Sequence, residues 1–549
     1  MSTQLMSKKN NPNPKKAPDA STSKQQAKPQ GRSRRSLPLL PIPIVAFLLL
    51  WAWIAVWQGD VFRLVRENSF FAFDSTLMDF EIGKPYGILW TIGRALLSTF
   101  RYPWLGGLIL AAMLTACCWL LGYAMRLTPR WRWVQYLPLG LYTGIFTFQG
   151  ISNWYEAESG QVMGIPFCIL LILCVWGMII RSFSRKPTPA FLVIPKDETP
   201  RQNRLQLYAL LATLILPMVY GHYERAYVRP IAQMQVGVYE QDWQHVIEVA
   251  HENDDLSYRP LAAMYAIALV QTGQIGDKMF DIRLDYDSLY AIGYTKPKHA
   301  GVQPTGLYQM ECDYHAGLVQ AAYHHAMESM AMEGPTIRNL KTLCKSSLLR
   351  SEWDVADKYL SILDKIPFEG GFVEKYRPMC GDTALINADP EMKMVRMLEP
   401  LHDAFENNFI QPVFLGYNAA LMEGRSVNAL WNSLMVNIYT KTMPGFLFRS
   451  QPLAGTTPPT SINEALTLMS NKEPKLKSLF PCIGMNEARL ASFVNETRQY
   501  MSSPEERAKH ARELFPKYKG YYPYYYFFGN LKATKKHSET KSSSNSGVN

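Results

Sequence analysis

Acidic residues gather in the stretch ENSFFAFDSTLMDFEIGKP (67–85), which contains Asp74, Asp79 and Glu81. Carboxylates in one loop can bind a metal ion or remove a proton as a general base, provided that their pKa suits the task. Arg94 and Arg101 follow closely and offer charge for a phosphate group. The stretch therefore gives one enzyme hypothesis, in which the three carboxylates are the catalytic groups.

A second group of reactive side chains lies in ECDYHAGLVQAAYHH (311–325), which holds Cys312, His315, His324 and His325. These residue types are zinc ligands. Gly317 is expected to turn the chain before the last two, and histidines on a helix surface are the simpler interpretation. We therefore predict no metal and no cofactor.

Cysteine spacing and known motifs add no chemistry. The cysteines of the second half are irregularly spaced, so their pairing stays open: Cys312, Cys344, Cys380 and Cys482. The sequence has no phosphate-binding Walker loop, no G-x-S-x-G, no H-E-x-x-H and no C-x-x-C.

The first elements that position these residues are helices predicted from long apolar runs of the sequence. The mean hydropathy of -0.12 hides a division, because almost every long apolar run precedes residue 223. Runs near the length of about 20 residues that crosses a bilayer predict five membrane spans: 37–57, 103–125, 134–150, 163–180 and 205–223. Residues 1–36 carry nine Lys and Arg against Asp19. We predict a disordered cytoplasmic tail there, in preference to a nucleic-acid-binding one.

The segment YGILWTIGRALLSTF (86–100) is the doubtful span, because it is short and carries Arg94 in its middle. If it does not cross, the arginine-rich connection 126–133 stays on the cytoplasmic side with the tail. We therefore predict that 86–100 is interfacial or re-entrant. An odd number of crossings then places the second half outside the cytoplasm.

The second half, 224–530, has the pattern of short amphipathic helices. Trp243 and Trp353 stand at two predicted helix starts, and Gly273 and Gly317 at predicted left-handed turns. Ser461 and Glu464 fit a capping box after two prolines. A Tyr-rich segment, 518–530, is expected to close the last helices or to contact a surface, and the tail 531–549 to be disordered.

These helix pairs resemble tetratricopeptide repeats, which stack into solenoids with extended binding surfaces. The fold class that we predict is all-α, with a multi-pass transmembrane domain (37–223) before a soluble helical-repeat domain (224–530).

The whole chain resembles an uncharacterised family of multi-pass bacterial inner-membrane proteins. The resemblance rests on 83–114, on LVQTGQIGDKMF (269–280), on EALTL (464–468) and on the Tyr-rich end. It implies an inner-membrane location with a periplasmic second half, and no activity.

Two functions follow as expectations. The first is a scaffold, without demonstrated catalysis, that binds the lipid bilayer and a protein or envelope polymer, and no nucleic acid. The alternative is an enzyme that resembles membrane glycosyltransferases acting on lipid-linked sugars, which carry acidic residues in their first outer loop. In this chain those residues would be Asp74, Asp79 and Glu81.

Overall fold

The computed structural model describes residues 41–155, 157–183, 199–254, 258–284, 308–399 and 434–529. Every regular element in these residues is helical, which confirms the all-α prediction. The two predicted tails, 1–36 and 531–549, lie outside the described residues.

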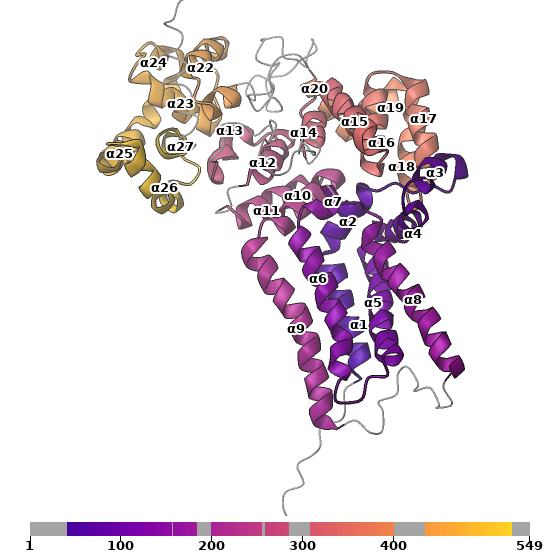
Figure 1. The fold of residues 1–549 in the computed structure, drawn as a ribbon. Helices are drawn as coiled ribbons and strands as arrows, with labels where there is room; N and C mark the ends of the chain where they lie inside the picture. The colour runs from indigo at the N-terminus through magenta and orange to yellow at the C-terminus, as the bar shows by residue number, and fades with distance from the viewer. Residues whose placement is uncertain are drawn as a thin grey trace, which may run out of the picture. The chain divides into compact units, whose positions relative to one another are not determined.

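The first part of the chain forms a bundle in which α1, α5, α6, α8 and α9 lie side by side (Figure 1). Its elements are α1 (Ile42–Ala52), a π-helical turn η1 (Trp53–Trp57), α2 (Gly59–Glu67), α3 (Ser75–Ile82), α4 (Gly87–Leu97), a 3-10 turn η2 (Ser98–Arg101), α5 (Pro103–Ala124), a 3-10 turn η3 (Arg132–Tyr136), α6 (Leu137–Gln149), α7 (Ser152–Tyr155), α8 (Gln161–Phe183) and α9 (Pro200–Glu224).

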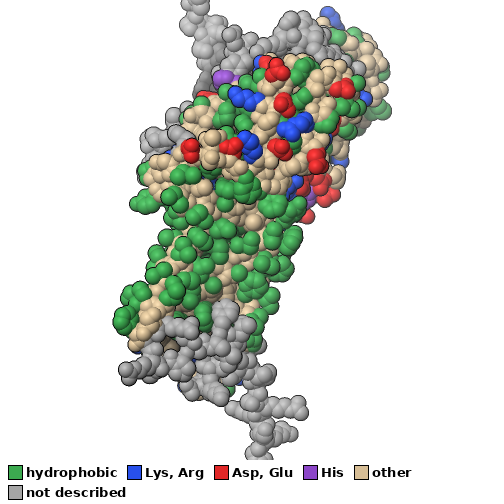
Figure 2. Space-filling view, turned by 90° about the vertical axis from the view of Figure 1, so that its right-hand side faces the viewer, with side chains coloured by type: hydrophobic (Ala, Val, Ile, Leu, Met, Phe, Trp, Pro, Cys, Tyr) green, Lys and Arg blue, Asp and Glu red, His purple; other side chains and the backbone are tan. Residues whose placement is uncertain are grey.

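Three helices in the described residues are long and apolar enough to cross a membrane: Pro103–Ala124, Gln161–Ile180 and Pro200–Glu224. A fourth candidate is the pair Ile42–Trp57 and Gly59–Glu67, which is bent by 66°. Figure 2 shows a belt of hydrophobic side chains on the surface, with charged side chains gathered on one side of the belt. Such a belt is what hydrocarbon would cover.

Two prolines inside these helices leave backbone carbonyls that side chains of α6 satisfy. Pro166 in α8 and Pro217 in α9 cannot donate a backbone hydrogen bond, so each frees the carbonyl four residues earlier. The Tyr142 hydroxyl donates to Val162 O at 3.1 Å, and the Thr143 hydroxyl donates to Thr213 O at 3.0 Å. Adjacent hydroxyls of α6 therefore satisfy both carbonyls, as apolar surroundings require.

The segment 86–100, predicted to be interfacial or re-entrant, forms α4 and η2. At 11 residues α4 is about 16 Å long, roughly half of a hydrocarbon core. It packs on the start of α8 at glycines. A Cβ on Gly93 would lie 2.0 Å from the Gly160 carbonyl oxygen, and one on Gly164 would lie 3.0 Å from Leu89 O. The pair Gly160 and Gly164 forms a G-x-x-x-G contact of the type found between close helices.

The second part is a series of short helices in which each commonly contacts the next, as in α10 to α12 and α14 to α17 (Figure 1). The elements are α10 (Val228–Glu240), α11 (Trp243–Glu252), α12 (Arg259–Gln271), α13 (Ile275–Lys278), the 3-10 turn η4 (Met279–Asp281), α14 (Gln309–His315), α15 (Val319–Glu333), α16 (Ile337–Leu349), α17 (Trp353–Leu363), α18 (Gly370–Tyr376), the 3-10 turn η7 (Arg377–Met379), α19 (Thr383–Ala388), α20 (Pro390–Leu398), α22 (Met443–Ser450), the 3-10 turn η10 (Gln451–Leu453), α23 (Thr460–Ser470), α24 (Leu476–Leu479), the 3-10 turn η11 (Pro481–Met485), α25 (Glu487–Thr497), the 3-10 turn η12 (Arg498–Tyr500), α26 (Pro504–Tyr518) and α27 (Tyr522–Phe528).

Several local predictions for this part are confirmed. Trp243 and Trp353 each begin a helix, and the Asp242 carboxylate caps the first of these by accepting from His245 N. Gly273 and Gly317 have φ angles of 70° and 87°, in the left-handed region that glycine tolerates.

The capping-box prediction is wrong. The helix α23 starts at Thr460, and its N-cap residue, Pro459, makes no side-chain cap bond. Asp277 accepts instead from the Thr460 backbone and hydroxyl. Glu464 is buried, where it accepts from Tyr522 N at 2.8 Å and pairs with Arg489 at 2.9 Å. The box failed because the aromatic helix α27 covers Glu464 and competes for its carboxylate.

The Tyr-rich end closes the last helices. In α27 and the residue before it, most of the aromatic side chains are buried: Tyr521, Tyr522, Tyr524, Tyr525 and Phe528. They pack against α23 and α26, and Tyr525 stacks near Phe280 with ring centroids 4.5 Å apart.

Candidate functional site

The predicted catalytic acids are placed apart from one another. Asp74 is the N-cap of α3, accepts from the backbone of Thr76 and Leu77, and pairs with Lys365. Glu81, at the other end of that helix, pairs with Lys84 and Arg94, while Asp79 is exposed. Seven residues of helix separate Asp74 from Glu81 by roughly 10 Å. Two of the three carboxylates thus have clear structural partners, and a catalytic role for them stays a prediction.

The stretch that holds these acids is built into the core of the second part. Phe70, Ala72 and Met78 are at most 3% exposed, and they share a hydrophobic cluster with residues of α14 to α20. The Phe73 backbone donates to Lys365 O at 2.8 Å, and Ile337 N donates to Ser69 O at 3.1 Å. The apolar letters FFAF (70–73) are the sequence signal of this burial.

The residues considered as metal ligands also separate. Cys312 and His315 are buried in α14, whereas His324 is exposed on α15. His325 lies 3.4 Å from the buried Asp313 carboxylate, which raises the pKa of this histidine although burial opposes that change. In the described part of the chain, no three His, Cys, Asp or Glu residues gather as metal ligands would. All eight cysteines lie in described segments and are free thiols.

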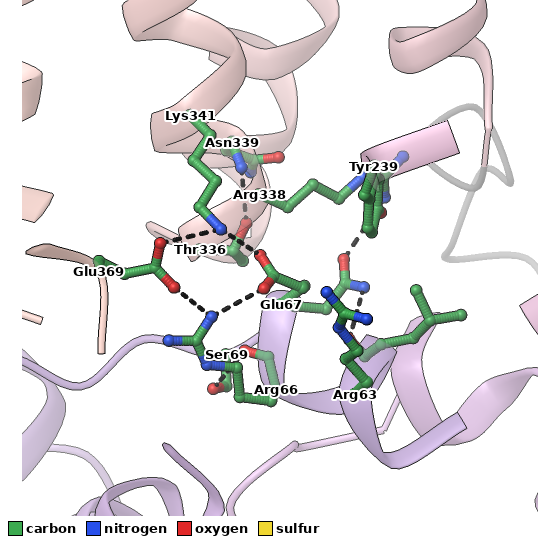
Figure 3. Close-up of polar contacts among 12 residues, drawn as sticks. Arg63, Arg66, Glu67, Ser69, Tyr239, Thr336, Arg338, Asn339, Lys341 and Glu369 are labelled. Carbon is green, nitrogen blue, oxygen red and sulfur yellow. Dashed lines mark hydrogen bonds and ion pairs between the residues drawn. The ribbon is translucent and has the colours of Figure 1, made fainter. Parts of the chain in front are cut away.

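The residues that do converge form a ring of alternating charges (Figure 3). Arg66 contacts Glu67 at 2.7 Å and also pairs with Glu369. Lys341 completes the ring at 3.0 Å from Glu67 and 2.9 Å from Glu369. Arg66 is 0% exposed and also donates to Pro367 O. The ring joins the end of α2 to α16 and to the turn before α18.

Electrostatics keeps this ring ionised. Burial alone would raise the pKa of Glu67, but Lys341 and Arg66 outweigh it and lower the pKa to about 2. Burial would lower the pKa of Arg66, but Glu67 and Glu369 reverse this and raise it. A buried charge held in this way is costly to leave without its partner.

Two further ion pairs extend the charged region. Arg338 binds the Glu311 carboxylate through two nitrogens, in the fork geometry typical of arginine. Glu391 accepts from Lys345 at 2.7 Å and from the Tyr376 hydroxyl at 2.7 Å. Burial favours the neutral form of Glu391. The charge of Lys345 is the largest influence that opposes burial, and the pKa of Glu391 falls to about 2.

A pocket of about 480 Å³ opens among these charges. Aromatic side chains form part of its wall: Tyr239, Tyr314, Phe372 and Tyr376. Its acidic lining is Glu67, Glu240, Glu311 and Glu369, and its basic lining is Arg63, Arg101, Arg338, Lys341, Lys345 and Lys375. The lining therefore has six cations against four anions. We refer to this cavity as the junction pocket, because α2 and η2 line it together with α10, α14, α16 and α18.

Most of the cations in the junction pocket have acidic partners, but Arg101 differs. Among the described residues, the Arg101 side chain makes no hydrogen bond or ion pair, although its charge helps to lower the pKa of Glu67, and it is half-buried. Lys375 pairs with Asp389 at 3.0 Å and donates to the Tyr376 hydroxyl at 3.1 Å, but at 43% exposed it is the most exposed of the paired cations. Arg101 and the exposed Lys375 are therefore the cations that an entering molecule can reach most readily.

Sequence reasoning missed this pocket. Arg101 was considered only as a phosphate partner for the predicted acids, and the ring residues were not considered at all. The ion pairs of the ring join residues about 300 positions apart in the sequence, and no local sequence pattern predicts such a pairing.

Comparison with known proteins adds a family and no activity. Neither the curated proteins nor the solved structures include a match to this chain. A family described as "Family of unknown function (DUF6057)" matches residues 146–529, well over half of the sequence. This match agrees with the expectation of an uncharacterised family, and the chain belongs to the DUF6057 family of unknown function.

Proposed function

We propose that this protein spans the bacterial inner membrane several times and binds an acidic envelope polymer with its second, periplasmic half. The observation that carries the proposal is the junction pocket, in which basic and aromatic side chains face one cavity. Sugars stack on aromatic rings, and their carboxylate or phosphate groups pair with arginine and lysine. The helical-repeat half would act as a binding scaffold.

The contacts of Arg94 support the topology in this proposal. Arg94 lies in α4 and binds Glu158 through two hydrogen bonds of 2.9 Å, just before α8 begins. In the five-span arrangement, Glu158 lies in the second outer loop. A half-length α4 that is tied to this loop stays on the outer side, so that segment 86–100 adds no crossing.

The α6 helix supports the same count. It has 13 residues and is preceded by η3, so it is shorter than the three clear candidates. Its hydroxyls nevertheless bind the carbonyls freed inside α8 and α9. The carbonyl of Thr213 lies near the middle of α9, and a helix that satisfies it there belongs in the membrane with α9.

The ring of charges supports a rigid connection between the two parts. Its residues come from α2, α16 and the turn before α18, and all are largely buried. A rigid connection keeps Arg101 and Lys375 at a constant separation, which favours recognition of a ligand with defined spacing between its acidic groups.

The test is calorimetric titration of the full-length protein in lipid nanodiscs. The probes are an oligouronate, an oligomer of glycerol phosphate and a neutral glucan of equal length. The variant R101Q/K375Q removes the cation that has no ion pair and the most exposed of the paired cations. The variant K358Q/K393Q is the matched control, because both lysines are exposed on the second half and neither lines the junction pocket.

We expect an acidic oligomer to bind and the neutral glucan not to. One or two lost charge-assisted bonds should weaken binding by about 10-fold or more in R101Q/K375Q, with little change in the control. Equal binding of the neutral glucan, or unchanged affinity in R101Q/K375Q, would contradict the proposal.

A further inference from the structure

A second cavity of about 480 Å³ lies where the ends of η1, α6 and α9 meet the start of α10. Trp53, Trp57, Phe146 and Met218 contribute apolar surface to it. Its charged side chains are Arg225, Arg229 and Glu252. The cavity, which we call the interface cavity, thus combines apolar walls with two arginines and one carboxylate.

The two arginines contact aromatic rings instead of acids. The Arg229 guanidinium lies 4.3 Å from the centroid of the Trp57 ring, and that of Arg225 lies 5.5 Å from the Phe148 ring. Within the described residues, neither arginine forms an ion pair, although the charge of Arg229 acts on the Asp60 carboxyl together with those of Arg63 and His245. The Arg225 side chain donates to the Tyr227 hydroxyl at 3.0 Å, but its Nε is buried without a partner. Their positive charge is therefore available to an anion.

An unused acceptor lines the same cavity. Asn153 is 1% exposed, and its Nδ2 donates to Phe146 O at 2.7 Å and to Gly150 O at 2.9 Å. Its Oδ1 is buried and has no partner. Leaving such an atom unsatisfied is costly, so this position favours a ligand that brings a hydrogen-bond donor.

Three exposed apolar side chains each adjoin a cavity-lining residue in the sequence. Val56 is 75% exposed, Leu216 is 68% exposed and Phe148 is 62% exposed. These belong to η1, α9 and α6, which are the helices that we place in the membrane. Trp57, which lines the cavity, is 41% exposed, as is common for tryptophan near lipid headgroups.

We propose that the interface cavity binds a glycerophospholipid of the outer leaflet whose headgroup carries both a phosphate and a donor group. The phosphate pairs with Arg225 and Arg229, and an ammonium or hydroxyl group donates to Asn153 and Glu252. The acyl chains then lie along the exposed apolar side chains of η1, α6 and α9. This inference rests on the membrane placement proposed above and is independent of the junction pocket.

The experiment measures lipid affinity for the full chain in detergent by native mass spectrometry. The probes are phosphatidylethanolamine, phosphatidylcholine with the same acyl chains, and soluble glycerophosphoethanolamine. The variant R225Q/R229Q removes both guanidinium groups. R201Q/R204Q is the matched control, since those arginines are exposed at the other end of α9. R225K/R229K keeps the charge and serves if the glutamine variant does not fold.

We expect phosphatidylethanolamine to bind the original protein and the control within about twofold of each other, and R225Q/R229Q to bind it at least about 10-fold more weakly. Phosphatidylcholine, which lacks a donor, should bind more weakly than phosphatidylethanolamine to the original protein and to R225K/R229K. Equal binding of the two lipids, unchanged affinity in R225Q/R229Q, or equal binding of the soluble headgroup would overturn the inference. Oligouronate titration of R225Q/R229Q, expected to be normal, separates this result from failure of the junction pocket.

Discussion

Replacing Arg66 by methionine should destabilise the protein more than the same replacement of Arg63 in the same helix. The side chain is 0% exposed and neutralises Glu67 and Glu369, which are at most 5% exposed. Breaking a buried ion pair typically costs about 3–5 kcal/mol, because a charge is left without its partner. Lys341 still contacts both carboxylates, so we expect about 3 kcal/mol, at the lower end of that range.

The matched control is Arg63→Met, one turn earlier in α2. Arg63 pairs at 2.5 Å with Glu240, whose side chain is 51% exposed, so its loss should cost less than about 1 kcal/mol. Guanidinium unfolding in detergent, followed by far-ultraviolet circular dichroism, gives both values. The double variant R66M/E369Q should recover part of the loss, since it removes one of the stranded charges. Equal destabilisation by R66M and R63M would refute the reasoning.

Three other predictions follow from different parts of the chain. Gly93→Ala should destabilise the protein by about 1–3 kcal/mol through overpacking, whereas Gly144→Ala, whose Cβ would meet nothing within 4 Å, should be neutral or stabilising in the same unfolding assay. Burial raises the pKa of Glu464 to about 7, so the folded state binds an extra proton and stability should fall as pH rises from about 4.5 to 7. Glu464→Gln should flatten that slope in unfolding curves recorded across this range. Topology reporters fused after residues 128 and 230 should give cytoplasmic and periplasmic signals, respectively, and a periplasmic signal at 128 would rule out five spans.

Local features of the second half were predictable because the information lies within a few residues. The helix start at Trp243 is capped by the adjacent Asp242, and the left-handed turns are made by Gly273 and Gly317. The capping box at Glu464 was an equally local prediction, but it was wrong. The Glu464 carboxylate accepts a hydrogen bond from Tyr522 of α27 instead. Short-range patterns thus hold where no distant segment competes for the same atoms.

The candidate site was not predictable because its residues come from segments that are far apart in the sequence. Glu67 and Arg66 belong to a helix that looks like an ordinary charged surface, and their partners follow roughly 300 residues later. The acids of residues 67–85 suggest catalysis in the sequence because they are close together there. In the structure, Asp74 caps the start of α3 and Glu81 forms an ion pair with Arg94.

The burial of Phe70, Ala72 and Met78 among helices of the second half has a practical consequence for anyone who wishes to excise that half. A fragment that starts near residue 224 would expose the apolar surface that these residues cover, and it would lose Arg66 and Glu67 of the charged ring while it keeps Lys341 and Glu369. Supplying residues 59–82 as a separate peptide should restore solubility, so the two pieces would behave as a split protein that reassembles.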